Sequence, residues 1–380
     1  MKLILNCLVL WFFGLYCISA ISQTDIQELG VLPQSIKETS GLLFYNGKLI
    51  THNDSGNAAE LYELDIETLQ ITRTIRITNA INIDWEDLAQ DDDFIYIADI
   101  GNNSGDRLDL GILRISKSDF DMHNEIIAER IDFLYEDQTD FTTTTDSDFD
   151  AEALFSLEDD LIVLTKQWQT QGTVAYRIPK LAGSFLAERL DSYQVDGLVT
   201  GASFDATTNA LYLAGYSQFL TPFFVEILNV DGNAIFGTEQ IKGNLSIGQA
   251  QVEAITLNDG IFYLTSEEFI NPPLLNTAPR LFQLTLDNGE EVPDSGESPE
   301  FIDDLLVYKQ ANSTQLNYQL NTDKPIFGMG IFDASGRKVR YTPLERITDD
   351  PIDISTFSQG LYYLAFFYGN SVISSPFFRN

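Results

Sequence analysis

Acid-containing segments and apolar runs follow one another in the same order five times along the first three quarters of the chain. The segment Asp84–Ala89 (DWEDLA), for example, precedes the apolar run FIYIAD. The first segment of each pair is, in chain order, ETSGLLF, DWEDLAQ, DAEALFS, VTGASFD and QVEAITL. Alternation of apolar and polar residues is the period of a β-strand. The pattern therefore predicts five pairs of neighbouring strands.

The five pairs share one spacing. The equivalent positions in the first strands are Ser40, Glu86, Glu152, Gly201 and Glu253, and thirteen residues later come Asn53, Asp99, Thr165, Ala214 and Ser266. A constant offset indicates a two-stranded hairpin of fixed register. Successive first strands are 46 to 66 residues apart, which leaves room for four antiparallel strands in each unit.

We therefore expect an all-β chain in which residues 23–288 form a five-bladed β-propeller. The fifth unit contains the strand RLFQLTL but no fourth strand of its own, and the segment DIQELGVLP near the start of the chain is available to supply it. Pairing of these two segments would close the ring and remove an exposed sheet edge. A six-bladed propeller is the alternative if the insert at 136–149 contains further strands.

The acids of the first strands are the main candidates for chemistry. In a propeller the first strand of each blade lines the central channel, so Glu86, Glu152 and Glu253 would gather near one mouth, with Ser40 beside them. Carboxylates in a partly buried channel repel one another unless a cation intervenes, and a hard divalent ion, calcium first, prefers such oxygen ligands. The three glutamates are therefore candidate metal ligands. The alternative is that they hydrogen-bond backbone amides and hold the blades together.

A second polar tier is expected beside these acids. Its members, with Ser40 from the first tier, are the candidate ligand-binding residues: Ser40, Asn53, Asp99, Thr165, Lys166 and Ser266. Lys166 is also a rival to a metal ion, because its ammonium group can itself compensate the glutamates.

Other motifs give weaker signals. Asp146, Asp148 and Asp150 alternate as in a calcium-binding EF-hand loop, but the required Gly and Glu are missing further on. His52 is the only histidine near a serine motif (THNDSG), and a structural role is expected for it rather than a catalytic triad. Three aromatic residues are candidates for a sugar platform, although aromatic residues in blades are usually core: Trp85, Trp168 and Tyr216.

Charge and leader sequence restrict the setting. The chain carries a formal net charge of −35, which disfavours nucleic acid and anionic lipid as partners and favours cations; adaptation to salty water explains the charge equally well. Residues 1–22 form an apolar run that predicts a signal peptide, with an uncleaved membrane anchor as the alternative. Both cysteines, Cys7 and Cys17, lie in this run, so we expect no disulfide in the exported protein. Because this run is the apolar segment of membrane length, we also expect no membrane span once it is removed.

Four short motifs carry a resemblance to a known group. They are Glu38–Leu42 (ETSGL), His52–Gly56 (HNDSG), DWEDLA and Asp99–Asn103 (DIGNN). Together they resemble secreted bacterial β-propellers related in pattern to the phytase-like and SdiA-regulated families, over about residues 24–288. The resemblance implies a propeller with a calcium site, whereas the basic residues that would grip phosphate in a phytase are not evident.

The C-terminal quarter reads differently. Residues 289–302 are acidic and rich in Pro, Gly and Ser, as in a linker. The short strands that follow predict a small β-sandwich, which is compatible with a carbohydrate-binding or spacer module. The segments Ile331–Val339 (IFDASGRKV) and Ile352–Leu364 (IDISTFSQGLYYL) resemble the C-terminal sorting domain of type IX secretion cargo in Bacteroidota. The resemblance implies that residues 303–380 engage the type IX machinery and that the protein passes through the periplasm to the medium or the outer cell surface.

Two functions are compatible with these patterns. The first is a non-enzymatic propeller, stabilised by calcium, that binds an extracellular ligand or partner at an acidic channel mouth. The second is a metal-dependent hydrolase of an ester, phosphate or glycan that uses the channel carboxylates. A general acid–base pair needs one protonated and one ionised carboxyl group near neutral pH. Because no pair stands out in the sequence, we expect binding rather than catalysis.

Overall fold

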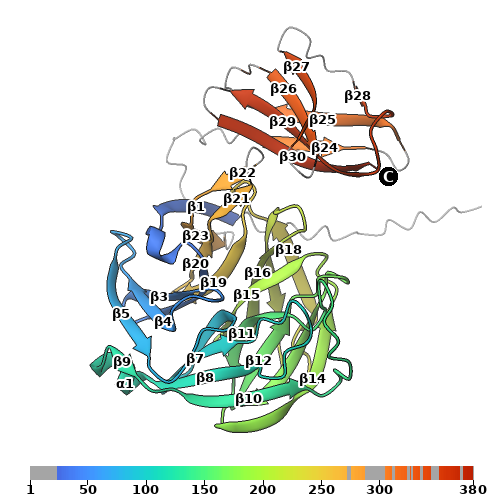
Figure 1. Cartoon of the computed structure of the whole chain (residues 1–380). Helices are drawn as coiled ribbons and strands as arrows, with labels where there is room; N and C mark the ends of the chain where they lie inside the picture. The colour runs from blue at the N-terminus through green and yellow to red at the C-terminus, as the bar shows by residue number, and fades with distance from the viewer. Residues whose placement is uncertain are drawn as a thin grey trace, which may run out of the picture.

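The protein is all-β and consists of a large region of several sheets followed by a smaller pair of sheets (Figure 1). The computed structural model describes residues 24–271, 275–286, 304–309, 313–322, 326, 328–333, 337–343, 351–368 and 371–379. The predicted signal peptide at 1–22 and the linker at 289–302 lie outside these residues. No helix in the described residues is long and apolar enough to cross a bilayer.

The large region contains five units, which we number 1 to 5 and which each begin with an inner strand. Unit 1 contains β2 (Thr39–Tyr45), β3 (Lys48–Asn53), β4 (Glu60–Leu64) and β5 (Ile71–Ile77). Unit 2 contains β6 (Trp85–Gln90), β7 (Phe94–Asp99), β8 (Gly111–Ser116) and β10 (Glu129–Tyr135). Unit 3 contains β11 (Ala151–Leu157), β12 (Asp160–Thr165), β13 (Thr173–Pro179) and β14 (Gly183–Tyr193). Unit 4 contains β15 (Leu198–Asp205), β16 (Ala210–Tyr216), β17 (Pro222–Leu228) and β18 (Glu239–Asn244). Unit 5 contains β19 (Val252–Asn258), β20 (Ile261–Ser266), β23 (Arg280–Leu286) and β1 (Thr24–Val31).

Short elements decorate these units. They are a 3-10 turn η1 (Gln34–Ile36), the helix α1 (Lys117–Met122), and the strands β9 (Glu125–Ile126), β21 (Phe269–Asn271) and β22 (Leu275–Thr277). The insert at 136–149, which is fully described, contains no strand. The extra strands that a sixth blade would need are therefore not in this insert.

Pairing of the first and the last strand of the large region completes unit 5. β1 runs antiparallel to β23, with Thr24 opposite Leu286 and Val31 opposite Arg280. This confirms the pairing of DIQELGVLP with RLFQLTL that the sequence predicts. The inner strands contact one another in the cyclic order β2, β6, β11, β15, β19 and back to β2. Units 2 and 3 also join at their outer edges, where β10 and β14 pair in parallel to give one eight-stranded sheet.

Each inner strand carries an irregularity near its start. In units 2, 3 and 5 the register shifts around Glu86, Glu152 and Glu253, so each glutamate is the extra residue of a β-bulge. A bulge locally re-aims a side chain out of the regular alternation. In unit 4 the extra residue is Thr200, because a longer hairpin loop moves the register, so Gly201 is not the counterpart of the glutamates.

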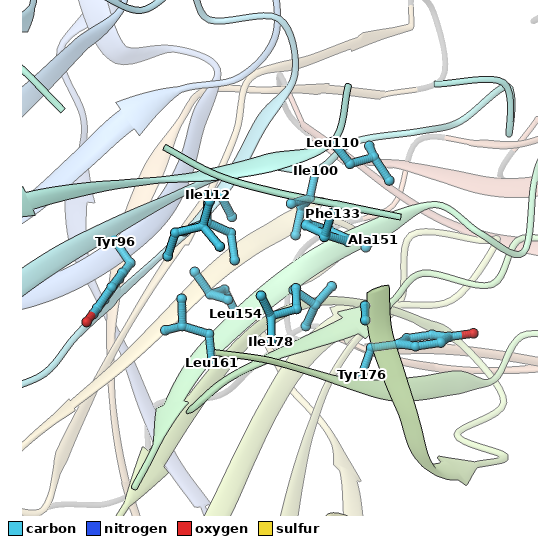
Figure 2. Close-up of a cluster of buried hydrophobic side chains, with 14 of the residues drawn as sticks. Tyr96, Ile100, Leu110, Ile112, Phe133, Ala151, Leu154, Leu161, Tyr176 and Ile178 are labelled. Carbon is cyan, nitrogen blue, oxygen red and sulfur yellow. The ribbon is translucent and has the colours of Figure 1, made fainter. Parts of the chain in front are cut away.

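Apolar side chains fill the spaces between neighbouring units. Figure 2 shows the cluster between units 2 and 3, where Ile112 and Phe133 from one sheet meet Leu154, Leu161 and Ile178 from the other. Similar clusters lie between the other units. Each buried aliphatic or aromatic side chain contributes about 1.5–3 kcal/mol relative to exposure, so the interfaces hold the inner strands in place.

The C-terminal residues form two sheets around one apolar cluster. One sheet contains β24 (Asp304–Tyr308), β25 (Gln315–Asn321) and β28 (Ile352–Asp353), and the other contains β27 (Lys338–Pro343), β26 (Gly328–Asp333), β29 (Gly360–Tyr368) and β30 (Ser371–Arg379). Leu316 and Ile352 from the first sheet pack with Ile331, Leu364 and Phe366 from the second. The described part of this region thus has its own core.

Candidate ligand and cation site

A polar cavity of about 150 Å³ lies at the end of the sheets where the inner strands begin and the second strands end. Its lining residues come from all five units: Ser40, Asp54, Glu86, Asn103, Glu152, Lys166, Trp168, Tyr216, Gln251, Glu253 and Glu267. Five of these are acids and one is a lysine. The cavity therefore has a strong excess of negative charge when its carboxyl groups are ionised.

Two positions in each unit build this lining. The first is the bulge of the inner strand, which places Glu86, Glu152 and Glu253. The second is the residue that ends or directly follows the second strand. In units 1, 3, 4 and 5 it is Asp54, Lys166, Tyr216 and Glu267, whereas in unit 2 it is Ile100, a buried core residue.

Three carboxylates meet at one corner of the cavity, which we call the acid corner. One oxygen from each of Asp54, Asp84 and Glu86 lies within 4.8 Å of the others. Glu86 is 5% exposed, and its carboxylate has no hydrogen-bond partner among the described residues. Gly101 packs directly against the carboxylates of Asp84 and Glu86, so closely that a Cβ there would overlap both. Of the three predicted metal ligands, Glu86 belongs to this group, whereas Glu152 and Glu253 line the cavity elsewhere.

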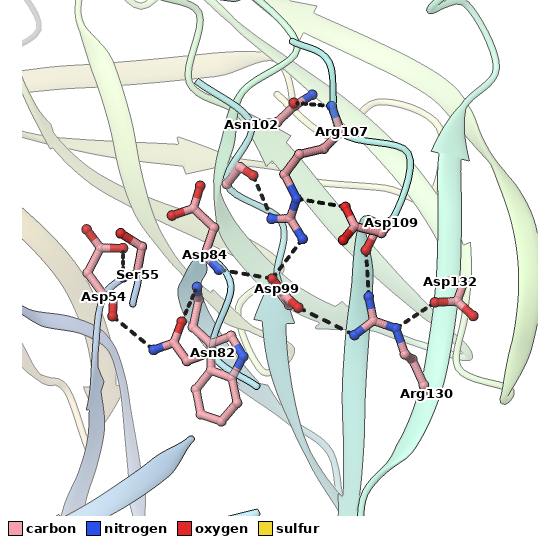
Figure 3. A network of polar contacts seen from close by, with 12 residues as sticks. Asp54, Ser55, Asn82, Asp84, Asp99, Asn102, Arg107, Asp109, Arg130 and Asp132 are labelled. Carbon is pink, nitrogen blue, oxygen red and sulfur yellow. Dashed lines mark hydrogen bonds and ion pairs between the residues drawn. The ribbon is translucent and has the colours of Figure 1, made fainter. Parts of the chain in front are cut away.

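A network of hydrogen bonds behind the acid corner fixes its backbone (Figure 3). The buried Asp99 accepts hydrogen bonds from the Asp84 amide at 3.1 Å and from Arg107 at 3.0 Å, and Arg107 also donates to the Gly101 carbonyl at 2.7 Å. The Asn82 side chain donates to the carbonyl of Asp54 at 2.9 Å. The basic groups thus act on Asp99 and the backbone, and they leave the carboxylates of the corner without a direct cationic partner among the described residues.

On the other side of the cavity the lysine is paired. The Lys166 ammonium group forms an ion pair with the Glu152 carboxylate and donates a hydrogen bond to the Tyr216 hydroxyl at 3.2 Å. It lies 4.7 Å from the centre of the Trp168 ring and 5.3 Å from that of Tyr216, which are cation–π distances. Trp168 is itself held by a hydrogen bond from its indole to Asp150 at 2.8 Å.

Unit 5 supplies a second pair of acids. Glu253 is 8% exposed and accepts a single long hydrogen bond, at 3.3 Å, from the Gln251 amide. The same amide donates to the Tyr216 hydroxyl at 3.2 Å. The Glu267 carboxylate has no hydrogen-bond partner among the described residues. Repulsion between the two carboxylates is one cause of the raised pKa of Glu253.

Burial and mutual repulsion make several of these acids weak. Burial, followed by the charges of Asp54 and Asp150, raises the pKa of Asp84 to about 7. Burial is also the main cause that raises the pKa of Glu253 and of Glu267 to about 8. The pKa of Glu86 is raised well above its ordinary value by burial and by Glu152. Without a bound cation, the folded protein therefore retains protons in this cavity near neutral pH.

A single buried aspartate links four inner strands beneath the cavity. The buried Asp87 accepts backbone hydrogen bonds from Leu88 and Leu154, each at 2.8 Å, and from Ala202 and Leu42. These amides belong to four different inner strands. A second cavity of about 120 Å³, lined by residues 88–90 and their counterparts, lies on the far side of Asp87. Burial raises the pKa of Asp87 well above its ordinary value, against the effect of the four N–H groups.

The predicted second polar tier does not face the cavity. Asn53, Asp99, Thr165 and Ser266 are buried but are not among the lining residues. Asn53 donates to the Ser35 carbonyl, Asp99 binds the two arginines, and Thr165 accepts from the Val174 amide. In units 1, 3 and 5 the next residue in the chain lines the cavity instead, because successive side chains of a strand point to opposite faces. In unit 2 the next residue is Ile100, a buried core residue. Of the predicted ligand-binding residues, Ser40 and Lys166 do line it.

The other residues that the sequence singles out differ in whether they line the cavity. Trp85 is a fully buried core residue, whereas Trp168 and Tyr216 line the cavity. His52 is fully buried away from the lining, and burial lowers its pKa to about 4, so it is neutral near pH 7. Asp150 is buried and accepts the Asn102 amide at 2.6 Å, so it positions the loop beside Trp168.

Four important residues were missed from the sequence. Asp54 and Asp84 lie in the motifs HNDSG and DWEDLA. Successive side chains along a strand point to opposite faces, so the residue after Asn53 is the signal that identifies Asp54. Glu267 follows Ser266 in the same way. The strand-linking role of Asp87 has no sequence signal beyond its place next to Glu86, because three of its four backbone partners belong to other units.

Comparison with known proteins gives structural neighbours but no family. No family model and no curated protein matches the chain. Among solved structures, the chain is similar to hydrazine synthase of Kuenenia stuttgartiensis, at 10% identity and a TM-score of 0.35 over 88% of this chain and 75% of that one. It is also similar to a putative oxidoreductase (glucose dehydrogenase) of Thermus thermophilus, at 10% identity and a TM-score of 0.41 over 69% of this chain and all of that one. A protein of unknown function from Bacteroides thetaiotaomicron matches at 9% identity and a TM-score of 0.35, over 69% of this chain and 76% of that one.

Proposed function

We propose that the large region is a five-bladed β-propeller that binds an extracellular ligand at one mouth of its channel, with a divalent cation held at the acid corner. The count of five blades is supported by the five units, the cyclic contacts of their inner strands and the β1–β23 pairing. Calcium is the ion that the donor set favours, because carboxylate oxygens are hard ligands.

The unpartnered Glu86 carboxylate carries this proposal. It is almost fully buried, has no hydrogen-bond donor among the described residues, and lies with Asp54 and Asp84 in one group of oxygens. A buried carboxylate without a partner is costly unless it is protonated or bound to a cation. Calcium at this corner would supply the missing positive charge, while Arg107 and Asp99 hold the backbone of Asp84 and Gly101 in place.

Binding of calcium to purified protein tests the proposal. Titration calorimetry should show saturable binding to the wild type, and Glu86→Gln should weaken it because one ligand oxygen loses its charge. Gly101→Ala should weaken it too, since the added Cβ would occupy the space of the Asp84 and Glu86 carboxylates. Glu63→Gln serves as the control, because Glu63 lies on β4, pairs with Arg73 and does not line the cavity. Equal calcium affinity in all four proteins would refute the metal site.

A hydrolase is the second candidate, and the pair Glu253 and Glu267 favours it. Each carboxyl group has a pKa raised to about 8, mainly by burial. Around pH 8, one protonated and one ionised carboxyl group could act as general acid and general base. Hydrolysis of ester, phosphate or glycoside panels by the wild type, and its loss in Glu253→Gln, would establish this function in place of simple binding.

We also propose that the protein is exported and that residues 303–380 are a β-sandwich that acts as its type IX sorting signal. The support is the sequence resemblance and the separate core of the C-terminal sheets. Deletion of residues 303–380 should leave the propeller folded but retained in the periplasm. Normal appearance of the shortened protein in the medium would contradict the sorting role.

A further inference from the structure

The donors and acceptors around the cavity are unequal in number. Three of the donor side chains are already used within the protein: Lys166 donates to Glu152 and Tyr216, Gln251 donates to Tyr216 and Glu253, and the Trp168 indole donates to Asp150. The Asn103 amide also lines the cavity. The acceptors are not used to the same extent. A ligand that complements the cavity must therefore bring donors rather than acceptors.

The surplus acceptors lie in two places. One is the acid corner, where the almost fully buried Glu86 has no partner among the described residues. The other is the pair Glu253 and Glu267, where the single hydrogen bond from Gln251 leaves three of four carboxylate oxygens without a donor in the described structure. A cation at the acid corner leaves this second pair unmatched. The pair consequently needs positive charge or donors from the ligand.

The size of the cavity limits what can enter. A volume of about 150 Å³ equals that of a protein cavity that holds one benzene molecule, or about six non-hydrogen atoms. Only the end group of a larger ligand therefore fits. An ammonium group on a short carbon stem satisfies this limit and carries three donors in a compact head.

The chain itself shows how the cavity accommodates such a group. The Lys166 ammonium is bound by Glu152 and the Tyr216 hydroxyl and lies against the rings of Trp168 and Tyr216. The Glu253 and Glu267 pair offers carboxylates across the same cavity without a lysine of its own. The surroundings thus suit a second ammonium group.

We propose that Glu253 and Glu267 form a subsite for the primary ammonium group of the ligand. This inference deepens the proposed function, since the ligand binds beside the cation at the acid corner. The carboxylates accept hydrogen bonds from the ammonium head, and the stem passes Gln251 toward the opening of the cavity. An amino sugar, a polyamine and a lysine side chain share this chemistry.

Titration calorimetry at fixed ionic strength, with and without saturating calcium, tests the subsite. The probes are n-butylammonium, cadaverine, glucosamine and lysine methyl ester, whose relative affinities distinguish the three sources. The controls are 1-butanol, glucose and tetramethylammonium, which lack the charge or the N–H donors. The primary ammonium probes should bind and the controls should not. Affinity for n-butylammonium and cadaverine should rise from about pH 6 to about pH 9, as the two carboxyl groups ionise while these alkylammonium groups, like that of lysine, stay protonated.

Variants then locate the binding. Glu253→Gln, and separately Glu267→Gln, should weaken butylammonium about tenfold, the usual effect of losing one charged hydrogen bond. Asp92→Asn makes the same change of charge in the hairpin loop at the opposite ends of the strands, where Asp92 is exposed, and should leave the affinity within about twofold. If one of the two glutamine variants fails to fold, the other still tests the subsite.

Several outcomes would overturn the subsite. These are absence of ammonium binding, equal binding of 1-butanol or glucose, and an equal loss of affinity in Asp92→Asn. Calcium binding without ammonium binding would reject the subsite alone. Ammonium binding that depends on Glu253, in a protein that does not bind calcium, would support the subsite and reject the metal part of the proposed function.

Discussion

Glu86 and Glu152 occupy the same bulge in neighbouring units, yet their surroundings differ in charge. In unit 3 the residue after the second strand is Lys166, which pairs with Glu152. In unit 2 the same position holds Ile100, which is buried in the core between units 2 and 3. Glu86 instead meets Asp54 and Asp84. The same backbone position thus holds a carboxylate that is paired with a lysine in unit 3 and one that faces other carboxylates in unit 2. The repeat provides the position, and a single neighbouring residue decides whether it needs an external cation.

Removal of the Lys166 ammonium group should leave Glu152, like Glu86, without a cationic partner, and it should have the largest effect on the free energy of unfolding. Lys166→Met leaves Glu152 buried without its ion-pair partner, and loss of one partner of a buried pair costs about 3–5 kcal/mol. Urea denaturation monitored by circular dichroism measures this loss. The double variant Lys166→Met/Glu152→Gln should recover much of it. A single variant as stable as the wild type would show that the ion pair does not compensate Glu152.

Stabilisation by calcium should depend on Glu86 and not on Glu152. A cation that binds only the folded protein stabilises it by about 2.7 kcal/mol at a hundredfold excess over its Kd. The melting temperature of the wild type should therefore rise with calcium and fall with EDTA. Glu86→Gln should abolish most of this rise, whereas Glu152→Gln should retain it. An equal response of the two variants would mean that the ion does not bind at the acid corner.

The pH dependence of stability should sharpen the comparison further. The folded-state pKa is raised to about 8 for Glu253 and Glu267 and to about 7 for Asp84. An acid with a raised pKa binds its proton more tightly in the folded state, so its stabilising contribution is present below the unfolded pKa of about 4 and is lost as pH rises through the folded pKa. Metal-free protein should thus lose about 5 °C in melting temperature between about pH 5 and about pH 8.5.

Two controls accompany this measurement. Glu253→Gln should flatten the pH dependence, because the amide does not titrate. Saturating calcium should offset the loss at the upper end of the range. A metal-free wild type whose melting temperature rises steadily up to about pH 8.5 would show that these carboxyl groups are not held protonated.

The smallest expected effect concerns unit 1, where Ser40 stands at the position that Glu86, Glu152 and Glu253 occupy in units 2, 3 and 5. In unit 1 the Ser40 hydroxyl donates a hydrogen bond to the Glu86 carbonyl at 2.5 Å, which ties β2 to β6. Ser40→Ala should cost about 1 kcal/mol, the usual net value of one hydrogen bond, with calcium binding unchanged within about twofold. A large loss of calcium affinity would assign Ser40 to the ligand set rather than to the frame.

The sequence predicted the strand pairs and the bulge acids better than it predicted the second tier. Periodicity located the strands, and the acids recur at the same place in three units. The predicted members Asn53, Thr165 and Ser266 each stand one residue before a side chain that lines the cavity, whereas Asp99 is followed by the core residue Ile100. A shift by one residue reverses the face of a strand, and the polar character of both neighbours hid the choice. The pairing of Lys166 with Glu152, rather than with Glu86, depends on three-dimensional packing that no spacing encodes.

The β1–β23 pairing has a consequence for the order of events during synthesis. Residues 24–31 leave the ribosome first among the described strands, but their partner at 280–286 follows about 250 residues later. At typical rates of about 5–20 residues per second, β1 waits for at least about ten seconds before it can pair. Contacts between distant residues also form slowly. Until then unit 5 has an open edge, so pairing of β1 with β23 is expected to be the last step in the folding of the large region.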